Sequence, residues 1–289
     1  MDSAIVGVIG GSGLYHMPSL ANAREVRVDT PFGQTSGPLR VGQIDGTPVA
    51  FLARHGERHG LLPSEVPYRA NIYAMKSLGV RYLLSLSAVG SLREGLRPLD
   101  MVLPDQFVDF TRQRSNSFFG RGAVAHVSMA EPVCPAVCGA LARGFAATEG
   151  DGNTRLHRGG TYVCIDGPQF STRAESNWYR SLGADVIGMT NLPEARLARE
   201  AQIAYGTLAM VTDYDCWHAR EAAVTAGEAI ANLRRNAERA QQVAIAAIRI
   251  LGDERPASSA HTALASALVT QPDDMPPAVQ NELAVLLRG

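Results

Sequence analysis

Two stretches of the sequence combine residue types that could carry chemistry. The first reads Ala-Arg-His-Gly-Glu-Arg-His-Gly at residues 53–60 and directly follows an apolar run. The planar guanidinium of Arg54 can donate two parallel charge-assisted bonds to a tetrahedral oxyanion, and His55 stands beside it. The stretch therefore predicts a phosphate site. A metal site on His55 and His59 is the rival interpretation, but the flanking glycines disfavour the helix that such a pair needs.

The second stretch, Thr-Asp-Tyr-Asp-Cys-Trp at residues 212–217, places two carboxylates beside aromatic side chains at the end of an apolar run. Burial and mutual repulsion raise the pKa of one acid in such a pair, so Asp213 or Asp215 could hold a proton at neutral pH. That proton could be delivered to a leaving group. A solvated acidic loop with metal or capping duties is the alternative that the motif leaves open.

Small residues at two further strand ends would let a ligand approach the backbone closely. The turn Gly-Gly-Ser-Gly at residues 10–13 can direct backbone N–H groups and the Ser12 hydroxyl at an anion. It lacks the third glycine of the dinucleotide fingerprint, because His16 stands there, and it lacks the lysine of a P-loop. Residues 87–91, Ser-Ala-Val-Gly-Ser, follow another apolar run. A plain turn remains possible at both places.

The elements that must position these residues alternate between short apolar runs and amphipathic stretches. We expect strands at residues 4–9, 39–44, 47–52, 82–86, 160–165, 184–187 and 205–211. Asp45-Gly46 favours a tight hairpin turn, which makes one pair of strands antiparallel. The pattern predicts an α/β fold with a twisted mixed, mostly parallel sheet flanked by helices.

Helices are expected at residues 67–78 and 228–251. Three capping boxes mark helix starts, namely Thr172 with Glu175, Asn191 with Glu194 and Thr225 with Glu228. We interpret residues 1–252 as a single domain. Residues 253–289 form a Pro- and Ser-rich tail with a short helix at 278–287, which either folds back or exchanges with a neighbouring chain.

Composition excludes several classes of partner. With 27 basic and 28 acidic side chains among 289 residues, the net charge of −1 gives no footprint for nucleic acid or an anionic membrane. The start of the sequence has no basic, apolar leader pattern and no run is long enough to span a bilayer, so a cytoplasmic protein is expected. The four cysteines lack zinc-type doublets and are interpreted as packing residues: Cys134, Cys138, Cys164 and Cys216.

Taken together, these motifs resemble the nucleoside phosphorylase family that contains the methylthioadenosine phosphorylases and the trimeric purine nucleoside phosphorylases. The resemblance runs from about residue 5 to 230 and rests on the stretches above. It rests also on Asp-Thr-Pro-Phe-Gly at 29–33, Tyr-Arg-Ala-Asn-Ile at 68–72, Met-Ala-Glu-Pro at 129–132, Gly-Pro-Gln-Phe-Ser-Thr-Arg-Ala-Glu-Ser at 167–176 and Met-Thr at 189–190. It implies a three-layer nucleoside phosphorylase-type fold and a homotrimer.

The resemblance also implies roles for individual residues. Phosphate would be held by Ser12, Arg54, His55, Ser87, the Ala88 backbone and Thr190. Ribose would lie on Met189, and the purine would meet Phe170, Ser171, Asp213 and Asp215. His126 would reach across a subunit boundary to cover the 5′ substituent, whose methylthio group would contact Ala226, Ala229 and Ile230. No metal and no organic cofactor are implied, because inorganic phosphate is a co-substrate.

The implied activity is phosphorolysis of methylthioadenosine in purine and methionine salvage, with Asp213 and Asp215 as the catalytic acids. A carboxylate at 213 suits a 6-amino purine, since family members that take 6-oxopurines generally carry Asn there. Gly188 instead resembles the 6-oxopurine and methylthioinosine branch, and Ser12 replaces a common Thr. A 6-oxopurine nucleoside or methylthioinosine phosphorylase therefore stays open, as does a non-catalytic nucleoside-binding regulatory protein. A hydrolytic nucleosidase ranks lower because the anion-binding residues are intact.

Overall fold

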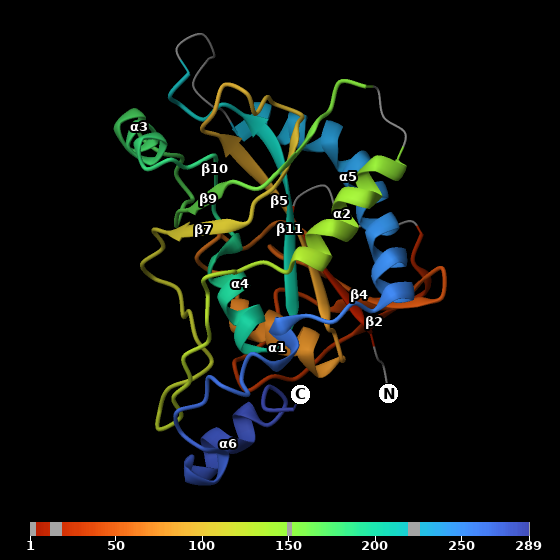
Figure 1. The fold of residues 1–289 in the computed structure, drawn as a ribbon, viewed down its shortest axis with the longest axis vertical. Helices are drawn as coiled ribbons and strands as arrows, with labels where there is room; N and C mark the ends of the chain where they lie inside the picture. Colours follow the sequence, from red (N-terminus) through yellow and green to blue (C-terminus); the bar gives the residue numbers. More distant parts are fainter. Residues whose placement is uncertain (1–3, 12–18, 149–151, 219–225, 289) are drawn as a thin grey trace.

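The computed structural model describes residues 4–11, 19–148, 152–218 and 226–288, and it builds one large mixed sheet (Figure 1). The main path of the sheet runs in the order β2-β3-β4-β1-β5-β10-β9-β7, and β11 joins β5 to β6, which pairs with β8. The strands are β1 (Val6–Gly10), β2 (Ala21–Val26), β3 (Leu39–Ile44), β4 (Thr47–Ala53), β5 (Tyr82–Ser91), β6 (Met101–Leu103), β7 (Gln106–Asp109), β8 (Leu156–Arg158), β9 (Thr161–Cys164), β10 (Val186–Gly188) and β11 (Ala204–Asp213).

Most neighbouring strands are parallel, as the alternating pattern predicted. The central pairs β4-β1, β1-β5 and β5-β11 are all parallel. The hairpin of β3 and β4 is antiparallel, and its turn residues Asp45 and Gly46 both have positive φ. All seven strands expected from the sequence are present. Two of them are longer than expected, since β5 continues past residue 86 and β11 past residue 211.

Four strands were not predicted because their sequences carry little apolar periodicity. The edge strand β2 reads Ala-Asn-Ala-Arg-Glu-Val and is mostly exposed, so only its pairing with β3 identifies it. The other three, β6, β7 and β8, have only three or four residues each. Such short segments take their conformation from the neighbouring strand rather than from their own pattern.

Helices cover both faces of the sheet. On one face lie α2 (Pro135–Ala147) and α5 (Ala226–Glu254), packed against each other, and on the other lie α1 (Tyr68–Ser77) and α4 (Asn191–Glu200) (Figure 1). Two hydrophobic cores separate accordingly: Val137 and Val243 belong to one, and Ile72 and Leu197 to the other. The helix α3 (Arg173–Ser181) stands at the edge of the sheet beside β10 and β9. The predicted layered α/β architecture is therefore confirmed.

The helix starts differ from the sequence analysis in two respects. The capping box of Thr172 and Glu175 is present at α3. The expected box of Asn191 and Glu194 is wrong, because α4 begins after Thr190 and the Glu194 side chain is turned into the core. Thr225 lies outside the described residues. Helix α2 was not predicted, since its run of small residues gives only a weak apolar stripe.

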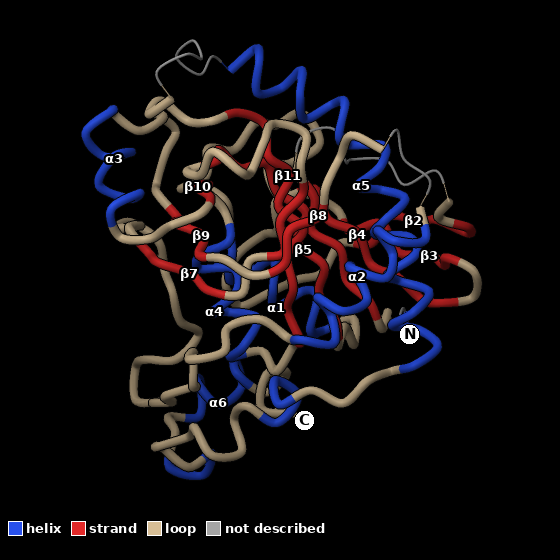
Figure 2. The backbone as a smooth tube through the Cα atoms, turned by 45° about the horizontal axis from the view of Figure 1, so that its top comes forward, coloured by secondary structure: helices blue, strands red, loops and turns tan. Residues whose placement is uncertain are grey.

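The residues after α5 return across the molecule, and the last of them pack on the face of α1 and α4. They form two short 3-10 turns, η1 (Ser259–Thr262) and η2 (Pro272–Asp274), and α6 (Pro277–Leu283), which begins and ends earlier than the expected helix (Figure 2). Leu283 and Leu286 are buried in the same core as α1. This segment therefore folds back on the rest of the chain. No helix among the described residues has the length and apolar character needed to cross a bilayer.

Candidate active site

The sequence-predicted residues meet in a cavity of about 210 Å³ at the ends of β5, β10 and β11. This position matches the rule that open α/β sheets bind ligands where their strands end. Of the predicted site residues, those that line the cavity are Arg54, His55, Ser87, Ala88, Phe170, Ser171, Met189, Thr190, Asp213 and Asp215. Strand ends distant in sequence thus supply one site.

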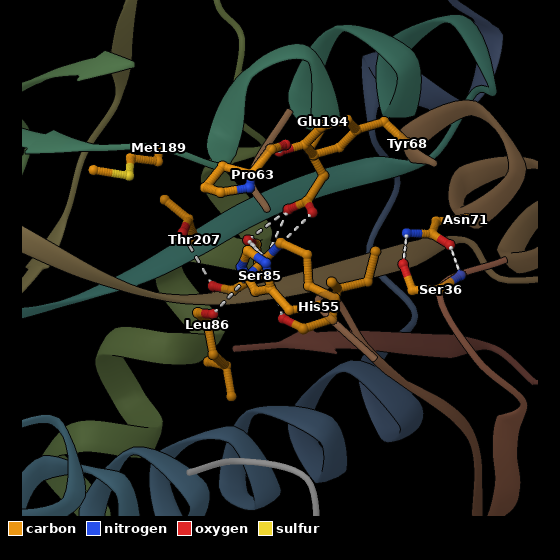
Figure 3. A network of polar contacts seen from close by, with 12 residues as sticks. Ser36, His55, Pro63, Tyr68, Asn71, Ser85, Leu86, Met189, Glu194 and Thr207 are labelled. Atoms are coloured by element: carbon orange, nitrogen blue, oxygen red, sulfur yellow. Dashed lines mark hydrogen bonds and ion pairs between the residues drawn. The ribbon is translucent and has the colours of Figure 1, made fainter. Parts of the chain in front are cut away.

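Arg54 lies at the end of β4, and its side chain is 1% exposed. The fork does not face the cavity: Nε donates to Glu194 Oε2 at 2.8 Å, and Nη2 donates to Glu194 Oε1 at 3.1 Å and to Ser85 Oγ at 2.7 Å. Figure 3 shows Glu194 reaching from α4 toward Ser85 on β5. The expectation that both prongs of the fork bind an anion is therefore wrong.

The pairing with Glu194 makes Arg54 a permanent cation. Burial favours the neutral form, but the Glu194 charge and hydrogen bonds outweigh it and hold the Arg54 pKa above its usual value. The group nearest the cavity is Nη1, which donates to the Leu86 carbonyl at 3.1 Å and lies beside Gly11. Arg54 can therefore attract an anion through its charge and one N–H of Nη1, but it cannot donate two parallel hydrogen bonds to it.

His55 is neutral in this environment. Burial first, and then the Arg54 charge, lower the pKa of His55 to about 4. Its Nδ1 lies 2.9 Å from the Leu61 carbonyl oxygen, which can only accept, so Nδ1 carries the proton and Nε2 is left as an acceptor. His55 stacks on His59 with ring centroids 4.4 Å apart. Within the described ranges, no group of three or more metal-binding side chains comes together.

Two hydroxyls complete the anion side of the cavity. Ser87 Oγ on β5 is buried and has no hydrogen-bond partner among the described residues, so it is available to a ligand. Thr190 is the N-cap of α4 but makes no side-chain capping bond. Leu192 has non-helical φ and ψ, so Thr190 lies on the turn that leads into the regular part of α4. The predicted Ser12 lies outside the described residues.

The two acids lie at the end of β11, and they differ in environment. Asp213 accepts from the Thr212 hydroxyl at 2.6 Å and from the Asp215 backbone N–H at 2.8 Å. Asp215 is 5% exposed, and its Oδ2 has no hydrogen-bond partner in the described chain. Burial, followed by the Asp213 charge, raises the pKa of Asp215. The two predicted acids are neighbours in the structure, and Asp215 is buried with a raised pKa.

The loop before α3 supplies two further lining residues, Phe170 and Ser171. Ser171 Oγ is buried without a partner among the described residues, and its carbonyl accepts from the Cys216 thiol at 3.2 Å. Phe170 is 46% exposed, so its ring presents an open face at the cavity. An aromatic face beside partnerless hydroxyl and carboxylate oxygens suits a flat heterocycle with polar edges.

Packing explains why residue 188 is a glycine, which the sequence alone did not reveal. A Cβ at this position would lie 2.0 Å from the hydroxyl oxygen of Tyr162, which is fully buried on β9. The absence of a side chain at 188 therefore makes room for Tyr162, and Gly188 itself also lines the cavity. Gly90 is similarly constrained, because a Cβ there would lie 2.9 Å from Asp213 Oδ1.

Of the remaining predicted residues, only His126 has a described side chain. His126 is exposed, lies outside the lining, and its backbone N–H donates to the Ala267 carbonyl of the C-terminal segment. The first turns of α5 contain Ala226, Ala229 and Ile230. The side chains of these three residues lie outside the described part of the structure.

Sequence reasoning missed the apolar lining and the groups that hold Arg54. Among the missed lining residues are Met210 on β11 and Leu233 on α5. Leu233 stands three, four and seven positions after Ile230, Ala229 and Ala226, so helical spacing could have found it. Ser85 and Glu194 carried no such signal, because their role depends on a contact with Arg54 that only the tertiary fold creates.

Comparison with known proteins places the chain in a family. The family model described as the phosphorylase superfamily matches residues 5–249. The S-methyl-5′-thioadenosine phosphorylase of Thermosynechococcus vestitus is 56% identical, over 99% of this chain and 98% of that protein. A crystal structure of a methylthioadenosine phosphorylase from an Antarctic soil metagenomic library is 56% identical with a TM-score of 0.94, covering 99% of this chain and 100% of that one.

A more distant structure is a variant of the adenosine/methylthioadenosine phosphorylase of Schistosoma mansoni, solved with methylthioadenosine. It is 32% identical and superposes with a TM-score of 0.80, over 99% of this chain and 98% of that chain. The resemblance inferred from the motifs is confirmed, as is the nucleoside phosphorylase-type fold. The chain belongs to the phosphorylase superfamily.

Proposed function

We propose that this protein cleaves S-methyl-5′-thioadenosine with inorganic phosphate, releasing adenine and 5-methylthioribose 1-phosphate. One observation carries the proposal: a single cavity holds a fixed cation with a partnerless hydroxyl and, beside them, two acids of different environment. Phosphorolysis needs both features, because negative charge must be bound as a nucleophile and must also be neutralised on the departing base. The names of the similar proteins agree with this substrate.

Phosphate would bind on the side formed by Arg54, His55, Ser87 and Thr190, with the Ala88 backbone and Ser12 as further donors. A monoprotonated phosphate can donate its O–H to His55 Nε2, because that nitrogen is unprotonated. Its other oxygens can accept from Ser87 Oγ and from the hydroxyl of Thr190, which also lines the cavity.

Base departure would be assisted by Asp213 and Asp215. As the C1′–N9 bond breaks, its electron pair moves to the purine, and a proton shared by the acid pair neutralises the base at N-7. Phosphate then forms the new C1′–O bond from the opposite face of the ribose. The raised pKa of Asp215, caused by burial and by the nearby Asp213 charge, supports this role because it favours a proton on the pair. No metal or organic cofactor enters the scheme.

The sugar would lie on Met189, and the 5′-methylthio group would meet an apolar surface. Met210 and Leu233 supply part of that surface, and the expected contacts with Ala226, Ala229 and Ile230 would extend it. Small alanines leave room, so we propose adenosine as a second, slower substrate. The Schistosoma protein, which is named for both nucleosides, supports this proposal.

We further propose a homotrimer that acts in cytoplasmic purine and methionine salvage. An exposed His126 on a segment anchored by the C-terminal chain suits a residue that covers a neighbour's 5′ site. All four cysteines are free thiols, as is usual in a reducing compartment.

The proposal is tested by measuring base release from methylthioadenosine, adenosine, methylthioinosine and inosine, each with and without phosphate. We expect phosphate-dependent release that is fastest with methylthioadenosine. Preference for the inosine compounds would identify a 6-oxopurine enzyme, release without phosphate would identify a hydrolase, and binding without turnover a regulatory protein. Asp213→Asn is expected to slow adenine release by at least about 100-fold, whereas Asp273→Asn, on an exposed turn, keeps the wild-type rate.

A further inference from the structure

Arg114 is a buried cation that the proposed chemistry does not use. It lies in the connection between β7 and α2, its side chain is 1% exposed, and it does not line the cavity. Its guanidinium lies over the ring of Tyr68, 5.3 Å from the centroid, which fixes the plane of the fork. A desolvated arginine of this kind requires a specific set of acceptors.

Those acceptors are four backbone carbonyls from two separate segments. Nη1 donates to Met189 and to Leu192, both at 2.6 Å. Nη2 donates to Asp166 at 2.9 Å and to Ile165 at 3.3 Å. The Asp166 carboxylate, 3.5 Å from Nε, is the nearby counter-charge.

Each segment carries one half of the candidate site. Met189 and Leu192 bracket Thr190, which stands at the anion side, and Met189 itself lines the cavity. Residues 165 and 166 begin the loop that ends in Phe170 and Ser171 on the base side. One planar, rigid fork therefore spans the two halves, and its fixed geometry sets the distance between their backbones.

We propose that Arg114 is a positioning residue that holds the phosphate-binding and base-binding halves of the cavity at the separation needed for attack on the anomeric carbon. The inference rests on the proposed function and adds a residue that touches neither substrate. Because reaction rate depends steeply on the placement of the reacting atoms, a shift of about 1 Å between the halves costs about 100-fold in rate.

The test compares three variants with the wild-type enzyme. Arg114→Lys keeps the charge and the aliphatic stem but cannot reach four carbonyls at once, and Arg114→Ala removes the fork. Arg112→Ala is the matched control, since it lies in the same connection with an exposed side chain. We expect Arg114→Lys to fold with a melting temperature near that of the wild type, to lose at least 10-fold in kcat, and to show raised KM values for both phosphate and nucleoside.

Chemical rescue separates positioning from a merely structural role. A second cavity of about 190 Å³ borders Arg114, Tyr68 and Ser115, and it offers guanidinium ion a route to the vacated position. Millimolar guanidinium chloride is expected to raise kcat of Arg114→Ala by at least 5-fold, while sodium chloride at equal ionic strength does not. Wild type and Arg112→Ala should gain nothing from either salt.

Two results would overturn the inference. One is wild-type kcat and KM values in folded Arg114→Lys. The other is a loss of kcat in both Arg114 variants that follows the fraction of unfolded protein and does not respond to guanidinium. A wild-type enzyme that releases no adenine from methylthioadenosine would instead contradict the proposed function, so the two failures are distinguishable.

Discussion

Replacing Glu194 by Gln removes the charge that keeps Arg54 buried, and its cost can be worked out from the contacts. The Glu194 carboxylate accepts four bonds: from Arg54 Nε at 2.8 Å and Nη2 at 3.1 Å, from Ser85 Oγ at 2.6 Å, and from Tyr205 Oη at 3.0 Å. Three of these donors converge on Oε1. A glutamine oxygen can replace Oε1, but its NH₂ group then faces the Nε–H of Arg54, so two donors oppose each other.

The expected loss of stability is large. Losing one charge-assisted hydrogen bond costs about 1.5–3 kcal/mol. The Arg54 charge is also left without its counter-charge at 1% exposure, and breaking a buried pair in this way costs about 3–5 kcal/mol in total. We therefore expect Glu194→Gln to lower the free energy of unfolding by about 3–5 kcal/mol and to raise the KM for phosphate, because Nη1 of Arg54 is held in place by the same network.

The assay is urea unfolding at fixed protomer concentration, so that assembly does not alter the comparison. Glu254→Gln is the matched control, because Glu254 forms a two-pronged pair with Arg143 on the exposed surface. We expect the control to keep the wild-type midpoint. Replacing both Arg54 and Glu194 by Met should give a protein more stable than Glu194→Gln, since no unpaired charge remains. Equal midpoints for Glu194→Gln and the control would refute the reasoning.

Two further predictions concern His55 and Gly188. Burial and the Arg54 charge lower the pKa of His55 from its usual 6.5 to about 4 in the folded protein, so the unfolded chain binds the extra proton and stability falls as pH drops from 6.5 toward 4. The free energy of unfolding is expected to be about 2 kcal/mol lower at pH 5 than at pH 8 because of this group. In His55→Gln the difference between the two pH values should shrink by that amount, and an unchanged difference would contradict the assignment. Gly188→Asn should destabilise the protein by at least about 1–3 kcal/mol, because the new side chain overlaps Tyr162. Adding Tyr162→Val should restore part of the lost stability in a thermal melt. A double variant less stable than Gly188→Asn alone would count against the overlap.

The local chemistry of the chain was predictable, because it depends on residues close in sequence. The hairpin at Asp45-Gly46, the capping box at Thr172 and the strand that ends in the two acids all formed as expected. These features depend on backbone preference and apolar pattern over a few residues. The same patterns indicated strand ends that meet at one cavity.

Long-range partners were not predictable. Arg54 and Glu194 are 140 residues apart, and nothing near either one indicates the pairing. Glu194 even fitted a capping-box pattern that the structure does not form, because its carboxylate lies buried in the network around Arg54. Gly188 is a comparable case, since its close contact with Tyr162 has no signal in the sequence around either residue. Such errors arise where tertiary contacts override a local motif.

The orientation of Arg54 bears on how the proposed reaction would proceed. A two-pronged Arg–phosphate pair would bind the nucleophile equally well before and during attack, and such uniform binding does not raise kcat. Because Nε and Nη2 of Arg54 donate to Glu194, Arg54 would act on a bound phosphate through its fixed positive charge and one N–H of Nη1. Ser87 and Thr190 supply hydroxyls that can rotate as the phosphate oxygen moves toward the anomeric carbon. The buried ion pair would therefore attract the phosphate by charge without fixing its position, so that the phosphate can move toward the anomeric carbon. Binding energy that is gained during this movement contributes to the rate.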